Sequence, residues 1–207
     1  MNGRSWTRVT ATLALSVAVM GAGAAWADGS STMGAHEPHA GLQQTRASSV
    51  QYVVPEVTLL RDDGKSISLP AEMNDGRPVM LNFIFTSCGS ICPLMSQIFA
   101  QVQRKLGSAG ASVHLMSIST DPEYDTPARL REYAGNFQAG PGWQHYTGTL
   151  EASLAAQRAF DVYRGDKMSH TPVTLLRAAP GQPWRRIDGF VTPDELMQEY
   201  RQLLASR

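Results

Sequence analysis

The chain contains two cysteines, Cys88 and Cys92, with three residues between them. In the thiolate form, cysteine attacks disulfides and binds soft metal ions such as Cu(I) and Zn(II). A disulfide that closes so short a loop would constrain the unfolded chain very little, so the spacing does not favour a stabilising cross-link. We therefore predict that the pair is chemical and acts in metal binding or in thiol–disulfide exchange.

The spacing of the pair leaves both kinds of chemistry open. Residues four apart on a helix have Cβ atoms about 5–6 Å apart, whereas a relaxed disulfide needs about 3.5–4.5 Å. The two thiols can therefore converge on a metal ion. They can also oxidise to a somewhat strained and reducible disulfide, provided that the loop adjusts.

Both cysteines lie between a predicted buried strand and a predicted helix. Residues 79–85 are a near-continuous apolar run, which is typical of a central strand. Residues 93–106 carry apolar side chains four apart and end before Gly107, as an amphipathic helix does. In open α/β sheets ligands bind at the carboxyl end of such a strand, and the free N–H groups of a helix start stabilise a thiolate. We therefore expect a lowered thiol pKa here.

Five histidines could supply a third ligand, and one imidazole added to two thiolates also suits Cu(II). His36 and His39 lie in a polar segment and could bind a metal weakly. His114 lies in a predicted strand and is expected to be a structural sheet residue, while His145 is expected in a surface loop. His170 immediately precedes a predicted strand that the order of elements described next places beside the cysteine turn, so it is the best-placed candidate.

The remaining pattern predicts the fold around these residues. An Asp-Gly turn joins two apolar runs into a hairpin, and a strand–helix–strand unit implies a right-handed crossover with parallel strands. Strands are predicted at residues 52–60, 65–69, 79–85, 113–119, 173–176 and 184–187, and helices at 93–106, from Thr126, at 150–161 and from Thr192. This order is that of an α/β, thioredoxin-like fold with an N-terminal β-hairpin and a helical insertion.

Two acidic residues follow the predicted strand at 113–119. Asp121 is expected to close a turn by accepting hydrogen bonds from backbone N–H groups. Asp125 precedes Thr126, which we predict to be the N-cap of a helix. Both interpretations are structural.

The first 27 residues have the features of a secretory signal peptide. Arg4 and Arg8 form a basic start, residues 11–22 are apolar, and Ala25-Trp26-Ala27 has the small-x-small pattern of a cleavage site. The apolar stretch of 12 residues is shorter than the roughly 20 needed to cross a bilayer. An uncleaved membrane anchor is the alternative, and in either case we expect a periplasmic or otherwise exported protein.

Residues 28–50 are rich in Gly, Ser, Ala and Gln and are predicted to be a flexible linker before a folded domain at residues 51–207. Removal of residues 1–27 takes away two arginines and no acid, which leaves 16 basic and 18 acidic side chains and a net charge of −2. No basic cluster could neutralise phosphates, so we expect no nucleic-acid partner. Membrane contact is expected only through an uncleaved signal segment.

Two motifs make the sequence resemble the Sco/SenC family of copper-binding proteins of respiratory membranes. The first is residues 83–93, which contain Cys-x₃-Cys-Pro, and the second is residues 119–127, which contain Asp-Pro-x-x-Asp-Thr-Pro. Gly142-Trp143 and His170 follow in the family's order, and the similarity spans residues 52–204. Many relatives have Pro-Asp where this chain has Gly89-Ser90, and Asp where it has Ser169.

The resemblance implies a thioredoxin-like fold and a copper ion bound by Cys88, Cys92 and His170. It also implies delivery of copper to the binuclear centre of cytochrome c oxidase, or reduction of that centre's cysteines. We therefore expect a metallochaperone whose partners are a copper-receiving protein, such as an oxidase subunit, and a thiol–disulfide reductant. The alternatives are a thiol–disulfide reductase, in which one cysteine attacks and the other resolves, and a redox or copper sensor.

We predict cleavage after Ala27, so that the mature chain begins at Asp28, because signal peptidase recognises small residues in this pattern. Mass spectrometry of the protein from its native cell envelope measures the N-terminus directly. A membrane-held species that begins at Met1 would contradict the prediction and support the anchor.

Overall fold

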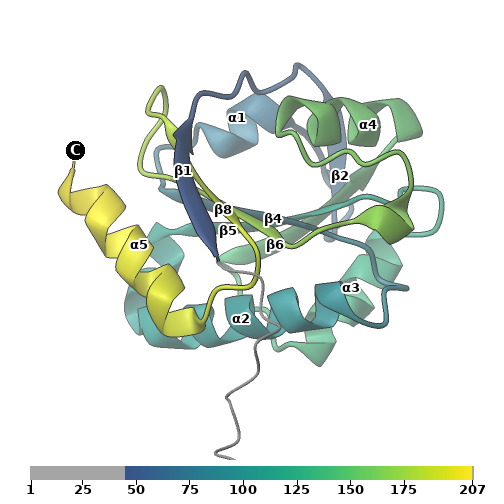
Figure 1. Ribbon diagram of the computed structural model, residues 1–207. Coiled ribbons are helices and arrows are strands. Elements are labelled where there is room, and N and C mark those ends of the chain that lie inside the picture. Colours follow the sequence, from purple (N-terminus) through teal and green to yellow (C-terminus); the bar gives the residue numbers. More distant parts are fainter. Residues whose placement is uncertain (1–44, 207) are drawn as a thin grey trace, which may run out of the picture. The chain divides into compact units, whose positions relative to one another are not determined.

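Eight strands form one sheet in residues 45–206, the part of the chain that the computed structural model describes (Figure 1). The strand order is β1-β8-β7-β4-β5-β6-β2-β3. β4, β5 and β6 are parallel, and the other neighbouring pairs are antiparallel. The strands are β1 (Arg46–Val50), β2 (Thr58–Arg61), β3 (Ser66–Ser68), β4 (Val79–Ile84), β5 (His114–Ser119), β6 (Trp143–Gly148), β7 (Val173–Arg177) and β8 (Trp184–Asp188).

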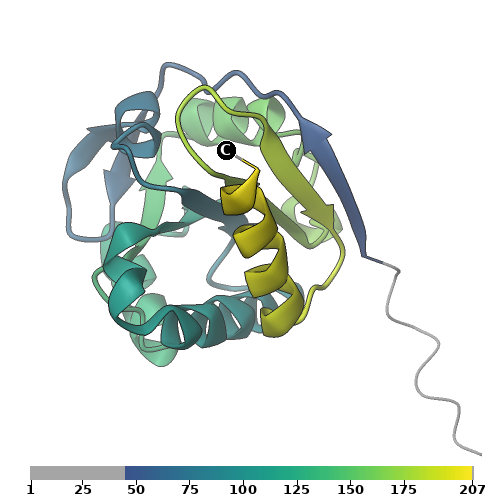
Figure 2. The same ribbon diagram turned by 90° about the vertical axis from the view of Figure 1, so that its left-hand side faces the viewer.

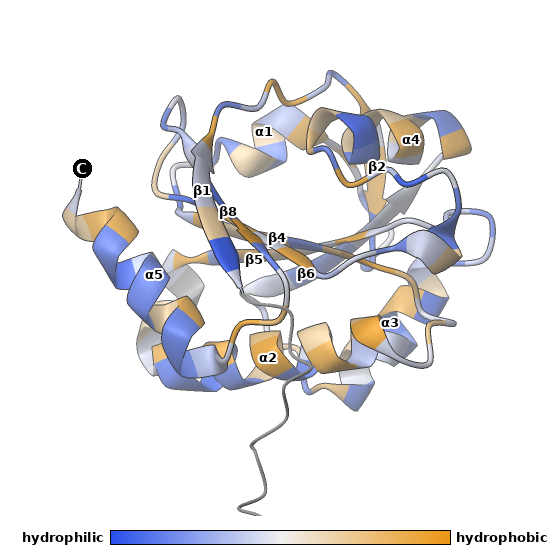
Figure 3. Cartoon of the chain, in the orientation of Figure 1, coloured by the Kyte–Doolittle hydropathy of each residue, from blue (hydrophilic) through white to orange (hydrophobic). Residues whose placement is uncertain are grey.

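Helices cover both faces of the sheet, as Figures 1 and 2 show. One face carries α1 (Leu69–Met73) and α4 (Leu150–Ala159), and the other carries α2 (Ile91–Leu106), α3 (Pro127–Asn136) and α5 (Pro193–Ala205). Figure 3 shows apolar and hydrophilic residues on different sides of these helices, as expected where one side packs on a sheet. Between residues 45 and 206, none of the helices has the length and apolar character needed to cross a membrane.

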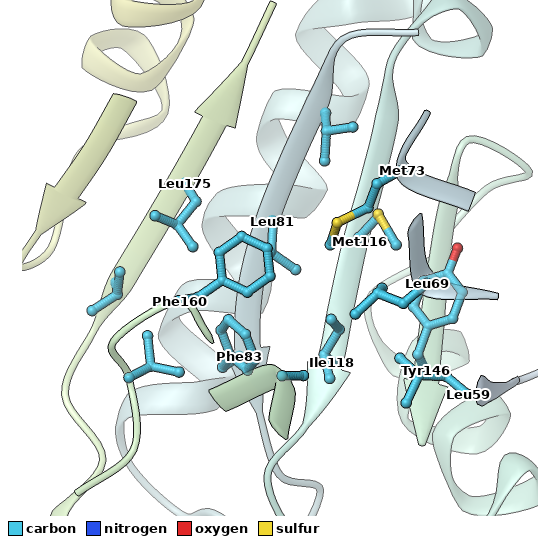
Figure 4. Close-up of a cluster of buried hydrophobic side chains, with 14 of the residues drawn as sticks. Leu59, Leu69, Met73, Leu81, Phe83, Met116, Ile118, Tyr146, Phe160 and Leu175 are labelled. Carbon is cyan, nitrogen blue, oxygen red and sulfur yellow. The ribbon is translucent and has the colours of Figure 1, made fainter. Parts of the chain in front are cut away.

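The central strands are buried on both faces. Every residue of β4 and of β5 is buried. In the cluster drawn in Figure 4, Leu81 and Phe83 of β4 pack with Met116 and Ile118 of β5 and with Phe160. Burial of each such side chain contributes about 1.5–3 kcal/mol to hydrophobic stabilisation. The predicted central strand is confirmed, and β4 is a firmly packed base for the residues that follow it.

The predicted thioredoxin-like order is confirmed. β4, α2 and β5 form the parallel β-α-β unit, and β7, β8 and α5 form the closing antiparallel pair and helix. β2 and β3 form the N-terminal hairpin. Thr126 caps α3 by accepting a hydrogen bond from the Arg129 N–H, and Thr192 and Glu195 form a capping box at the start of α5.

The N-terminal part differs from the prediction in two places. Residues 52–57 are not in a strand, so the first arm of the hairpin is shorter than expected. Arg46–Val50 form β1, antiparallel to β8, although we expected residues 28–50 to be linker. That expectation is wrong for the last five residues because a serine-rich edge strand has no apolar pattern and is held by its backbone ladder. The signal peptide and the rest of the linker lie outside the described residues.

β6 occupies the place where we expected a surface loop around His145. The His145 side chain is fully buried, its Nδ1 lies 3.6 Å from Asp62 Oδ2, and its ring packs on Trp143 with centroids 5.0 Å apart. The expectation is wrong because polar residues interrupt the apolar pattern of a strand that is buried beneath α3. Gly142 permits the entry to β6, since a Cβ there would lie 2.7 Å from the Gly110 carbonyl oxygen.

A polar network at the amino-terminal ends of β4 and β5 includes His114, which is a buried sheet residue as predicted. His114 Nε2 lies 2.8 Å from the Tyr146 hydroxyl, which donates to Glu72 Oε1 at 2.9 Å. Burial lowers the pKa of His114 below its usual value, and the positive charge of Arg77 lowers it further. The carboxylates of Asp75 and Glu72 oppose this shift without reversing it.

We expect the free energy of unfolding to fall as the pH drops below about 6.5. The fold holds His114 neutral, whereas the unfolded chain binds the proton, so acid favours unfolding. Urea denaturation at pH 7.5 and pH 5.5 measures the difference. In His114→Gln the difference should shrink without vanishing, because burial also lowers the pKa of His170. If the pH dependence of the unfolding free energy were unchanged in His114→Gln, His114 would not be a source of it.

Candidate metal and thiol site

Cys88 and Cys92 lie where they were predicted, between the end of β4 and the start of α2. The helix begins at Ile91, so Cys92 is in its first turn and Cys88 is in the loop before it. The Cys92 N–H donates to Cys88 Sγ at 3.5 Å, and the Phe85 N–H donates to Cys92 Sγ at 3.4 Å. Both thiols are free. A backbone N–H of the first helical turn therefore faces the Cys88 sulfur, and the N–H of the residue after β4 faces the Cys92 sulfur.

The two thiols differ in exposure and in acidity. Cys88 is partly exposed, whereas Cys92 is fully buried. Burial by itself would raise the pKa of the Cys88 thiol, but hydrogen bonds from the backbone N–H groups of Cys92 and Ser90 outweigh it and lower the pKa. Burial raises the pKa of the Cys92 thiol, and contact with Cys88 raises it further, against the Phe85 N–H. The expected lowering of a thiol pKa thus holds for Cys88 and is wrong for Cys92, because desolvation dominates there.

An apolar pocket encloses the Cys92 side chain. Ile84 and Phe85 at the end of β4 form a cluster with Leu130 and Tyr133 of α3 and with Cys92 itself. The Tyr133 hydroxyl lies 2.8 Å from the Ser96 hydroxyl, so its polar end is satisfied within the pocket. α3 therefore covers the inner cysteine, and the accessible side of the pair is that of Cys88.

Asp125 connects the cysteine loop to the end of β5. Its fully buried carboxylate accepts hydrogen bonds from the Thr86 N–H at 3.1 Å, from the Thr86 hydroxyl, and from the Ser119 hydroxyl at 2.6 Å. Thr86 is two residues before Cys88, and Ser119 is the last residue of β5. We did not predict this role from the sequence. The only sign of it in the sequence is that Thr86 and Ser119 each lie at the end of a predicted central strand.

Asp121 is held differently from the prediction. Its carboxylate pairs with Lys167 Nζ at 2.5 Å instead of accepting from backbone N–H groups. The turn is closed by the Asp121 carbonyl, which accepts from the N–H groups of Tyr124 and Asp125. The expectation is wrong because Lys167 lies 46 residues away, where a local pattern cannot reveal it.

His170 lies at the same end of the sheet as the cysteines, just before β7. Its Nε2 is 2.9 Å from the Phe83 carbonyl oxygen, and the side chain is 6% exposed. A carbonyl can only accept, so Nε2 carries the proton and donates, which leaves the lone pair of the neutral ring on Nδ1. Burial lowers the pKa of His170, the Phe83 carbonyl opposes this, and Arg164 adds to it. The imidazole is therefore neutral at neutral pH.

The arrangement brings the two thiols together and places the imidazole at the same sheet edge. Within residues 45–206, no three His, Cys, Asp or Glu side chains are already grouped closely enough to hold a metal ion. The donor set nevertheless fits a soft metal, since two sulfurs lie side by side and the third candidate has a fixed tautomer. A ligating histidine commonly donates its other N–H to a carbonyl in this manner. His36 and His39 lie outside the described residues.

A family model and individual relatives match the same kind of protein. The family model for SCO1/SenC matches residues 45–205. The SCO1 protein homolog of Bacillus subtilis is 34% identical over 106 residues, which are 51% of this chain and 54% of that protein. The mitochondrial SCO1 homolog 1 of Arabidopsis thaliana is 34% identical over 107 residues, which are 51% of this chain and 31% of that protein. The match thus spans about half or less of these relatives.

Solved structures share the fold. ScoI of Arabidopsis thaliana with copper bound is 27% identical with a TM-score of 0.63, over 75% of this chain and 99% of that one. BsSco, described as a member of the Sco family of cytochrome c oxidase assembly proteins with a disulfide switch, is 25% identical with a TM-score of 0.63, over 77% and 98%. Yeast Sco1 with copper bound, at 20% identity and a TM-score of 0.62 over 76% and 91%, supports the fold alone. These likenesses confirm the predicted fold class.

We expect an alkylating reagent such as iodoacetamide to modify Cys88 on the order of tenfold faster than Cys92 at pH 7.5, because the thiolate is the reacting form and Cys88 is both more acidic and more exposed. Peptide mass spectrometry of reduced protein, quenched at intervals, measures both rates. Unfolding in urea should equalise them, which is the control. Faster modification of Cys92 in the folded protein would contradict the assignment.

Proposed function

The chain belongs to the SCO1/SenC family, and on that premise we propose that it is an exported copper metallochaperone. One copper ion is bound by Cys88, Cys92 and His170 and is passed to a protein that carries a copper centre. The named activity of the Sco proteins, cytochrome c oxidase assembly, makes a subunit of such an oxidase the proposed recipient. Copper is the cargo in this scheme.

The observation that carries the proposal is the asymmetric pair of free thiols at the start of α2, with the imidazole of His170 at the same sheet edge. Two thiolates with one imidazole favour Cu(I) and also accept Cu(II). Copper in a solved relative, the Arabidopsis ScoI, is consistent with this choice of metal.

Some residues of this chain hold the proposed copper site in place, and others keep one side of it accessible. Backbone N–H groups stabilise the Cys88 thiolate on the accessible side, where a partner's ligands can approach. The pocket of Ile84, Phe85, Leu130 and Tyr133 keeps water away from Cys92 on the inner side. The Phe83 carbonyl orients the His170 ring so that Nδ1 is the available nitrogen.

A second candidate function is thiol–disulfide reduction, and one observation favours it. A partly exposed cysteine of lowered pKa beside a buried cysteine of raised pKa is an arrangement suited to attack by the first and resolution by the second. In that case Cys88 attacks the partner's disulfide, and Cys92 then displaces the reduced partner as the internal disulfide forms. A thiol reductant would restore the dithiol.

We expect the reduced protein to bind about one copper ion per chain, and either Cys88→Ser or Cys92→Ser to weaken Cu(I) binding more than about 100-fold, because too few soft ligands remain. His170→Ala should keep some two-coordinate Cu(I) binding and lose Cu(II) together with its thiolate-to-copper absorption band. Competition with a Cu(I) chelator and visible spectra on adding Cu(II) measure the two effects. The variant His36→Ala/His39→Ala is the matched control and should behave as wild type.

Disulfide exchange with a model peptide separates the two candidate functions. A His170→Ala variant with an unchanged copper spectrum and a large loss of exchange rate would overturn the metallochaperone assignment in favour of the reductase. One equivalent of Cu(I) retained by a variant that carries both Cys88→Ser and Cys92→Ser would place the metal elsewhere, with His36 and His39 as the next candidates.

A further inference from the structure

The segment that leads into His170 is exposed along its whole length. Residues 163–169 are all exposed, between the buried Val162 and the buried His170. A cavity of about 440 Å³ lies between this segment, α4 and the loop after β5. The segment therefore gains little from apolar burial, and its position depends on specific contacts.

The backbone hydrogen bonds of this segment are local. The Met168 N–H donates to Asp166 Oδ1 at 2.9 Å, the Ser169 N–H to the Asp166 carbonyl at 3.0 Å, and the His170 N–H to the Lys167 carbonyl at 3.1 Å. These bonds shape the turn η2 (Lys167–Ser169) but do not attach it to the sheet. At the far end, Tyr163 lies under the guanidinium of Arg158.

Besides the bond from the His170 ring to the Phe83 carbonyl, Lys167 makes long-range contacts at the His170 end of this segment. Its Nζ lies 2.5 Å from Asp121 Oδ2, at the end of β5, and 5.7 Å from the centroid of the Phe85 ring, at the end of β4. Phe85 is the residue whose N–H donates to Cys92 Sγ. One side chain therefore joins the histidine segment to both strands that support the cysteine site.

The acidic partner is itself held in place. Asp121 is 8% exposed, and its N–H donates to the Ser119 hydroxyl at 2.9 Å. An ion pair whose carboxylate is fixed and nearly buried restricts the lysine more than a pair between two flexible surface side chains does. Lys65 and Asp63, in the first hairpin, form a pair of the flexible kind, with side chains 70% and 40% exposed.

We propose that Lys167 is a positioning residue that holds the His170 segment against the cysteine site through Asp121 and Phe85. The inference rests on the proposed copper site, since the positioned imidazole is the one assigned there as a ligand. Lys167 holds the segment and does not itself bind the metal.

The first test uses the metal-free protein. In Lys167→Met, which keeps an apolar stem and removes the charge, the amides of Met168, Ser169 and His170 should exchange with solvent about fivefold faster by NMR, the size of effect expected from losing a surface ion pair. Lys167→Arg should restore the wild-type rates, and Lys65→Met is the matched control. Amides of β4 report whether the fold is intact. Unchanged exchange at Met168, Ser169 and His170 would overturn the proposal.

The second test uses copper. Cu(II) should bind Lys167→Met about fivefold more weakly than wild type, and the loss of Cu(I) affinity should be smaller, because the two thiolates alone still bind Cu(I). Adding Asp121→Asn to Lys167→Met should cause no further loss if the two side chains act through one contact. Faster exchange with an unchanged Cu(II) affinity would overturn the positioning role. If wild type binds no copper, the proposed function fails, while the exchange rates still decide whether Lys167 holds the segment.

Discussion

The buried carboxylate of Asp125 is the contact on which the geometry of the cysteine loop depends. It accepts from the backbone and side chain of Thr86 and from the Ser119 hydroxyl, so the ends of two parallel central strands are held by one negative charge. Hydrogen bonds to a charged group contribute about 1.5–3 kcal/mol each, and a buried carboxylate deprived of them would be costly. The path of the chain from β4 to Cys88 is therefore set by an electrostatic requirement at its start. Because Asp125 immediately precedes Thr126, the N-cap of α3, the same residue also places the helix that covers Cys92.

The difference between the two thiols follows from where the helix begins. A start at Ile91 puts Cys92 inside the first turn, facing the apolar pocket, and leaves Cys88 in the loop, where backbone N–H groups reach its sulfur. Hydrogen bonding then lowers the pKa of the Cys88 thiol, whereas desolvation raises the pKa of the chemically identical Cys92 thiol. An inner ligand that stays in place and an outer one that is accessible suit a site from which an ion is passed on. The same difference suits stepwise exchange of a disulfide, which is why the two proposed functions share one site.

The strongest local patterns in the sequence were sufficient for the central elements. The apolar run of β4, the amphipathic α2 and the capping box of α5 could each be predicted from residues close together in the chain, and so could the position of the cysteines between strand and helix. The failures share a physical cause. β1 is held by its backbone ladder, His145 is a polar residue buried beneath α3, and the partner of Asp121 lies 46 residues away. The opposite pKa shifts of Cys88 and Cys92 likewise depend on burial, which a short motif does not encode.

The pairing of β1 with β8 has a consequence for how the folded unit ends. β8 has two neighbours in the sheet, β7 on one side and β1 on the other. A chain that began at residue 51 would lack β1 and would uncover the backbone N–H and C=O groups of Trp184–Asp188. An open strand edge of this kind is a template for pairing with another molecule. The short serine-rich segment before residue 51 therefore belongs to the folded sheet, where it pairs with the edge of β8 and forms a short, polar edge in its place.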